Sequence, residues 1–205
     1  MSDAHAIETS TGLDTRKLGI WTFIGSECLF FATLIGTYVV YRGKSLVGPF
    51  PHMEYTTPDG KVLEPIFEIP LVTTGTALLL FSSFFIVLAL YGAQRGNRKM
   101  LLGWLAATIA CGLFFVGMQV YEFTHFVHKG LTLKGNLFGA TFYMLTGFHG
   151  SHVTIGVIWL TTMFGLALRG KVPPEKALNL EIAALYWHFV DVVWIVIFPV
   201  VYLMR

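Results

Sequence analysis

Charged residues are scarce in this chain. Asp, Glu, Lys and Arg make up only 13% of its 205 residues, whereas 55% are hydrophobic, and the mean hydropathy is +0.66. This composition excludes an ordinary soluble domain and is typical of a polytopic membrane protein. The 14 basic residues are spread between apolar segments and the net charge is only +2, so no nucleic-acid-binding surface is predicted. The predicted environment is lipid.

Cysteine is almost absent, and the amino-terminal segment lacks the features of a secretory signal. Cys28 and Cys111 both lie in apolar segments without a metal-ligand spacing, so we expect them to pack as small hydrophobic side chains. The first 15 residues contain no Lys or Arg and no apolar core followed by a cleavage site. We predict that residues 1–15 form a polar tail.

Five long apolar runs are present, and each is long enough to cross a bilayer as a helix. A hydrocarbon core of roughly 30 Å needs about 20 apolar residues per helix. The predicted fold class is therefore all-α, with a transmembrane domain of five helices over residues 16–205. The expected spans are about 18–41, 70–93, 100–125, 139–168 and 182–204. The segment 43–68 is too small and too polar to form a core of its own.

Basic residues are unevenly divided between the two sides of the predicted membrane domain. Eight belong to the N-terminal side, in residues 16–17, 95–99 and 169–176, and six belong to the other side. The positive-inside rule then predicts a cytoplasmic N-terminus and a C-terminus outside. The crowded basic residues at 95–99 would also suit the anionic head groups of lipids.

Several ionisable side chains fall within the predicted spans, where they are costly and often functional. Glu27 has Phe and Leu residues as its helical neighbours, so we expect its carboxyl to be protonated near neutral pH. Its role is either to exchange protons or to hydrogen-bond a neighbouring helix as a neutral group. Glu122 with His125, and His188 with Asp191, are each three residues apart, so each pair is expected to meet on one helix face.

A third pair at the same spacing, His149 and His152, raises the question of a metal or haem site. Both rings could face the bundle interior and ligate one ion. Two ligands do not complete a tetrahedral or di-haem site, and no second predicted span contains two histidines at this spacing, since of His125 and His128 only the first falls within residues 100–125. The residues alone therefore leave open both a metal or haem site and a role in hydrogen bonding.

Four segments together resemble subunit III of the haem–copper respiratory oxidases. They are WTFIGSECLFF at 21–31, MQVYEF at 118–123, TGFHGSHVTIG at 146–156 and YWHFVDVVWIVIF at 186–198. The resemblance runs from about residue 15 to the end of the chain, whose length fits the five-helix bacterial form. It implies a multi-pass protein of the bacterial inner membrane, in a cytochrome c or quinol oxidase that reduces dioxygen to water and pumps protons.

The resemblance also implies the cofactors and partners. This chain would hold no catalytic residue, metal or redox centre; the haems and copper would lie in partner subunits, and the chain would bind phospholipid. Its main contact would be oxidase subunit I, with subunit II and a small subunit IV as further partners. It would stabilise subunit I, hold lipid and support proton uptake.

Residue by residue, Glu27 matches the family's buried carboxyl that reacts with carbodiimides, as a protonated carboxyl in an apolar site would. The other matching positions are implied to make interhelical polar contacts or contacts with lipid: Glu122, His149, His152, His188 and Asp191. Gly147 and Gly150 would allow close helix approach. Two alternatives remain at this point, a related subunit of a nitric oxide reductase and an independent membrane carrier or di-haem cytochrome b.

Overall fold

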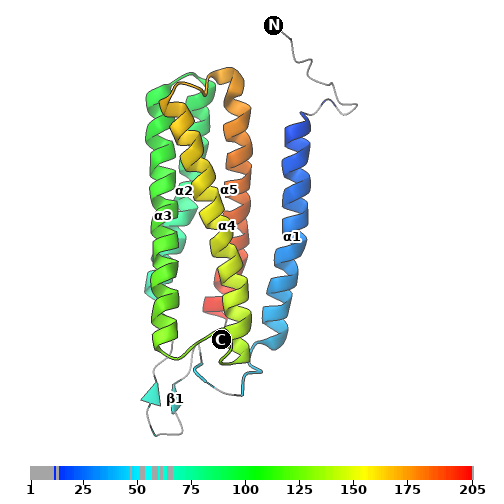
Figure 1. Cartoon of the computed structure of the whole chain (residues 1–205), viewed down its shortest axis with the longest axis vertical. Helices are drawn as coiled ribbons and strands as arrows, with labels where there is room; N and C mark the ends of the chain where they lie inside the picture. Colours follow the sequence, from blue (N-terminus) through cyan, green and yellow to red (C-terminus); the bar gives the residue numbers. More distant parts are fainter. Residues whose placement is uncertain are drawn as a thin grey trace.

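Five long helices run side by side in the computed structural model (Figure 1). The structure describes residues 12, 14–46, 48–50, 54–56, 60, 62–63 and 67–204. The helices are α1 (Thr15–Tyr41), α2 (Ile69–Gln94), α3 (Arg98–His128), α4 (Leu137–Leu168) and α5 (Ala177–Phe198). All five are long and apolar enough to cross a membrane. The predicted all-α class and the predicted number of spans are confirmed.

Shorter elements connect or extend these helices. Between α1 and α2, β1 (Tyr55–Thr56) and β2 (Val62–Leu63) pair as a small antiparallel hairpin. A 3₁₀ turn, η1 (Pro174–Lys176), precedes α5, and a π-helical turn, η2 (Pro199–Leu203), follows it. Since Pro199 has no N–H to donate to the preceding turn, the backbone hydrogen-bond pattern changes from α-helical to π-helical at this residue.

The predicted tail, residues 1–15, lies outside the described residues except for Gly12, Asp14 and Thr15. Asp14 caps α1 by accepting a hydrogen bond from the backbone N–H of Arg16 at 2.8 Å, and the Arg16 hydrogen bonds lower the pKa of this exposed carboxyl. At the other end of the domain, α5 begins at Ala177, before the expected span start at 182. Helix ends do not mark membrane boundaries, so the predicted division into tail and spans stays a prediction.

The turns that join the helices carry recognisable end signals. Gly96 follows α2 with a φ of 67°, a conformation that glycine adopts without strain, and the next residue, Asn97, caps α3 by accepting from the N–H of Met100 at 3.1 Å. Asn136 caps α4 in the same way through the N–H of Gly139. These signals make the connections between α2 and α3 and between α3 and α4 short.

Helix α5 is the centre of the bundle, and α1 stands at its edge. α5 packs against α1, α2 and α4, and twelve of its residues are buried. By contrast, α1 packs chiefly against α4 and α5 and buries only Ile20, Phe31 and Tyr38. Figure 1 shows α1 separated from α3 by α4. Most of the α1 surface is therefore free to meet lipid or another protein.

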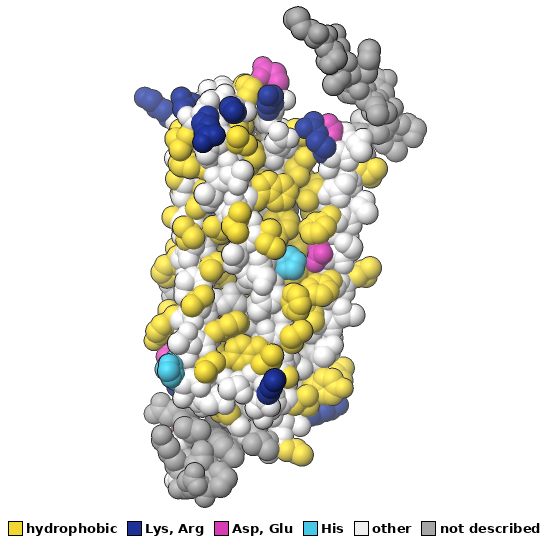
Figure 2. Space-filling model, in the orientation of Figure 1, with side chains coloured by type: hydrophobic (Ala, Val, Ile, Leu, Met, Phe, Trp, Pro, Cys, Tyr) yellow, Lys and Arg dark blue, Asp and Glu magenta, His cyan; other side chains and the backbone are white. Residues whose placement is uncertain are grey.

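Charge is concentrated at the two ends of the molecule. Figure 2 shows basic side chains gathered at the end where α1 begins and a largely apolar surface along the middle. At that end Lys17 forms an ion pair of 2.7 Å with Glu181, which joins α1 to α5. The side chain of Arg98 donates to the backbone carbonyl of Leu168 and so caps the end of α4. This distribution is that of a membrane-spanning bundle.

Two glycines let neighbouring helices approach closely. A Cβ on Gly112 of α3 would lie 2.7 Å from Cη2 of Trp187 on α5 and 2.7 Å from Cγ2 of Val157 on α4. Gly150 of α4 has the Gln119 side chain of α3 against it, so the prediction of close approach there is confirmed. The same prediction for Gly147 is wrong, because nothing lies within 4 Å of a Cβ built there.

Replacement of Gly112 by alanine should destabilise the bundle by about 1–3 kcal/mol, because the new methyl group forces the fully buried Trp187 ring to move. Gly117→Ala, on the same helix with nothing within 4 Å of its Cβ, is the matched control and should not destabilise. The measurement is unfolding of the purified protein in detergent, followed by tryptophan fluorescence. Equal stability of the two variants would contradict this packing.

Candidate functional site

Glu27 and His152 meet between α1 and α4 in the middle of the bundle. Glu27 Oε2 lies 3.2 Å from His152 Nε2, and the side chains are 20% and 14% exposed. His152 Nδ1 lies 2.7 Å from the backbone carbonyl of Phe148, one turn earlier on α4. A carbonyl oxygen only accepts, so Nδ1 carries a ring proton. In a neutral imidazole Nε2 is then an acceptor, which can form a hydrogen bond with a Glu27 carboxyl that donates to it.

Aromatic side chains surround this pair. The Phe31 ring lies edge-on to the His152 ring with centroids 5.0 Å apart, and the hydroxyl of Tyr186 donates to the His152 backbone carbonyl at 3.1 Å. Beside them runs a groove of about 290 Å³ lined by Ile20, Phe23, His152, Ile155, Trp159 and Tyr186. Most of these lining groups are hydrocarbon, so the groove suits a lipid chain better than a polar ligand.

His149 does not join His152 in a common site. Its ring is completely buried, and neither ring nitrogen has a hydrogen-bond partner among the described residues. It stacks on Trp194 with centroids 4.8 Å apart and meets the edge of Phe115 at 5.9 Å. Among the described residues His149 thus makes ring contacts and no interhelical hydrogen bond, and its expected polar or lipid-contact role stays a prediction. In the described part of the chain, no three or more His, Cys, Asp or Glu side chains converge as metal ligands would.

His188 and Asp191 of α5 both contact Ser83 of α2 and do not contact each other directly. The hydroxyl of Ser83 donates to Asp191 Oδ2 and lies 3.0 Å from His188 Nδ1. The expectation of a direct pair is corrected, because the α2 hydroxyl fits between the two side chains. Although Ser, His and Asp are the residue types of a hydrolytic triad, here the serine lies between the other two. In a triad the histidine lies between the serine and the aspartate, which orients it as a general base, so this arrangement is not that of a triad.

Glu122 pairs with the C-terminal turn and not with His125. Its Oε2 accepts from the hydroxyl of Tyr202 at 2.9 Å, and the residue is only 4% exposed, so it cannot contact lipid as an exposed group would. His125 instead points toward Glu68, with Nε2 and Oε1 3.5 Å apart. The expected pair of Glu122 and His125 is wrong because α3 turns its Glu122 face toward η2. The carboxyl still links helical elements, as the resemblance implied.

Other interhelical hydrogen bonds were not anticipated from the sequence. Trp187 and Trp194 of α5 donate from their indole nitrogens to Ser82 and Thr76 of α2, each at 2.9 Å. Together with Ser83 they form a ladder between α2 and α5. The available signal was the recurrence of small hydroxyl residues along α2.

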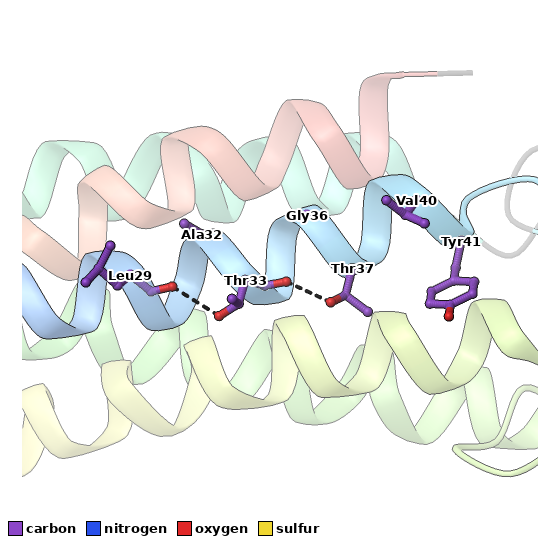
Figure 3. Close-up of a pocket in the computed structure, with 7 residues that line it drawn as sticks. All are labelled: Leu29, Ala32, Thr33, Gly36, Thr37, Val40 and Tyr41. Carbon is purple, nitrogen blue, oxygen red and sulfur yellow. Dashed lines mark hydrogen bonds between the residues drawn. The ribbon is translucent and has the colours of Figure 1, made fainter.

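A second hollow lies along one face of α1. Figure 3 shows the side chains that line it, which all come from α1. The hydroxyls of Thr33 and Thr37 donate to the backbone carbonyls of Leu29 and Thr33, at 3.0 and 2.8 Å. Because these hydroxyls are already bonded within α1, this face presents little free polar chemistry.

Comparison with known proteins identifies the family to which this chain is similar. The family model for cytochrome c oxidase subunit III matches residues 1–205. The quinol oxidase subunit 3 of Bacillus subtilis is 38% identical over 187 residues, which cover 91% of this chain and 86% of that protein. The cytochrome c oxidase subunit 3 of Bacillus sp. strain PS3 is 40% identical over 189 residues, covering 92% and 86%. That of Alkalihalophilus pseudofirmus is 36% identical and covers 98% of each chain.

These findings confirm the resemblance that the four sequence segments carried, and they favour the oxidase over the nitric oxide reductase and di-haem alternatives. The five apolar helices and the bacterial relatives indicate a multi-pass protein of the bacterial plasma membrane. The chain therefore belongs to the cytochrome c oxidase subunit III family, as a membrane subunit of a respiratory haem–copper oxidase.

Proposed function

We propose that this chain is the non-catalytic subunit of its oxidase, which stabilises the large subunit, holds lipid and supports proton uptake. The histidines within the bundle support this, because each is engaged by its neighbours: His149 by aromatic rings, His152 by Glu27 and His188 by Ser83. The haems and copper would lie in subunits I and II. Subunit I would be the main contact, and a small subunit IV a further one.

The Glu27–His152 contact is the observation that carries the proposed role in proton uptake. The backbone carbonyl of Phe148 fixes a proton on Nδ1, so Nε2 is free to accept the carboxyl proton of Glu27. A neutral pair of this kind suits an apolar site, where an ion pair would pay a desolvation cost. Since both side chains remain partly exposed, Glu27 can exchange its proton without unfolding the bundle.

The lipid role is supported by two surfaces. The apolar groove beside His152 has the shape and chemistry to take an acyl chain. The basic residues at the end where α1 begins, Arg95, Lys99 and Lys171 among them, would face anionic head groups if that end is cytoplasmic. We therefore propose the same orientation that the positive-inside rule predicts, with the N-terminus in the cytoplasm.

The relatives carry both names, quinol oxidase and cytochrome c oxidase, at similar identity. Both kinds of enzyme thus use a subunit of this type. We propose that the choice of donor resides in the partner subunits.

Infrared difference spectra should show Glu27 protonated at neutral pH. The C=O stretching band of its carboxyl should disappear in the Glu27→Gln variant, because the amide absorbs elsewhere. Glu122→Gln is the matched control, since it removes a different buried carboxyl and should leave the Glu27 band in place. A carboxylate band assigned to Glu27 at neutral pH would contradict the neutral pair with His152.

The haem and copper content of the purified oxidase should be unchanged by Glu27→Gln, because Glu27 is proposed to hold a proton and not a metal. The variant should also keep its initial turnover but lose activity sooner under sustained turnover. Metal analysis, a visible spectrum and a progress curve measure these outcomes. A fall in metal content would overturn the non-catalytic assignment.

A further inference from the structure

Hydrogen bonds link Asp191, Ser83 and His188 in series, and Nε2 of His188, at the end of the series, has no hydrogen-bond partner in the described part of the molecule. Ser83 has one hydroxyl proton, which it donates to Asp191 Oδ2. His188 Nδ1 lies 3.0 Å from Ser83 Oγ, and because the Ser83 proton goes to Asp191, Nδ1 is the donor in this second contact. In the neutral imidazole this leaves a lone pair on Nε2, which finds no partner there and is not among the fully buried polar atoms.

His188 Nε2 lies at a membrane depth where lipid offers no hydrogen bond. Ser83 is near the middle of α2, and His188 is near the middle of the helical stretch Pro174–Leu203. Head groups would be roughly 15 Å away, half of a hydrocarbon core of roughly 30 Å, and acyl chains offer no hydrogen bonds. The pair of Glu27 and His152 on the α1–α4 side differs, because each of its members has the other as a partner.

The surface around His188 has the character of a contact face. Leu80 and Val87, one turn before and one turn after Ser83 on α2, are 40% and 48% exposed, and Val192, one turn after His188, is 58% exposed. An accessible acceptor ringed by apolar side chains is what a second transmembrane helix with one polar side chain would fit.

We infer that the α2–α5 face centred on His188 is the docking surface for a transmembrane helix of the large oxidase subunit, which presents a hydrogen-bond donor to His188 Nε2. This inference rests on the proposed association with that subunit and goes further by naming the face and the chemistry of the contact. The donor is a hydroxyl, amide or indole group at the same membrane depth. Lipid or a second copy of this chain on the same face are competing occupants.

Photo-crosslinking within the intact oxidase tests the face. A photoreactive amino acid replaces Val192 on the α2–α5 face or Ile158 on α4, whose exposures of 58% and 61% are matched. Crosslinking to the large subunit is expected from position 192 and not from position 158. Crosslinks from 158 alone, or from 192 only to lipid or to a second copy of the chain, would overturn the inference.

The contact itself is tested by His188→Phe, which keeps a ring but removes the acceptor. Retention of this chain on the oxidase during detergent washing should fall about threefold or more, in line with one hydrogen bond between membrane helices. His149→Phe makes the same replacement at a buried ring that has no hydrogen bond in the described structure, and it should leave retention unchanged. Equal retention of wild type and His188→Phe, or equal loss in both variants, would contradict the proposed bond.

The two proposals fail in different ways. If the chain does not co-purify with a haem- and copper-containing subunit, the proposed function is wrong. If it co-purifies but position 192 yields no crosslink to the large subunit, only the docking face is wrong.

Discussion

A hydrocarbon environment supplies no hydrogen bonds, and this single constraint accounts for most of the side-chain arrangement of this protein. A polar group at membrane depth is costly unless another part of the protein or a partner satisfies it. The contacts between α2 and α5 follow from it: two indole N–H groups, an imidazole and a carboxyl of α5 all bond to three hydroxyls of α2. These bonds fix the rotation of α5 relative to α2, because each requires a donor and an acceptor at the same depth.

The same constraint explains why α1 can be loosely packed and yet held in place. Only a few of its residues are buried, and the hydroxyls of Thr33 and Thr37 bond to its own backbone. At one end its polar contacts with the bundle are the ion pair of Lys17 with Glu181 and the hydrogen bond of 3.0 Å that Arg16 donates to Asn179, and in the middle Glu27 contacts His152. A protonatable carboxyl thus lies on the most exposed helix, where an apolar groove opens beside it.

Close packing and polar bonding meet at Trp187. Its ring fills the space that Gly112 and Gly156 leave open, while its indole nitrogen donates to Ser82. Small residues on α3 and α4 therefore allow α5 to approach closely enough for the bond to α2 to form. Dispersion contacts and hydrogen bonds support each other here. This is expected in a bilayer, where no hydrophobic driving force brings helices together.

The sequence by itself determined the number of helices, because hydropathy over about 20 residues reports directly on the ability to span a bilayer. It also singled out the ionisable residues, since such groups are rare inside apolar runs, and its motifs carried the family. It could not assign the partners of those residues. Spacing along one helix suggested Glu122 with His125 and His188 with Asp191, whereas the observed partners, Tyr202 and Ser83, come from other elements.

Only the tertiary structure decided which polar groups are satisfied within the bundle and which are not. The two histidines of HGSH differ for this reason: helix rotation turns His149 into an aromatic core and His152 toward Glu27. A difference of about 60° around a helix, which is trivial in sequence, separates a packing residue from a proton-sharing one. The relative rotation of packed helices is a property of the whole bundle, so no single segment encodes it.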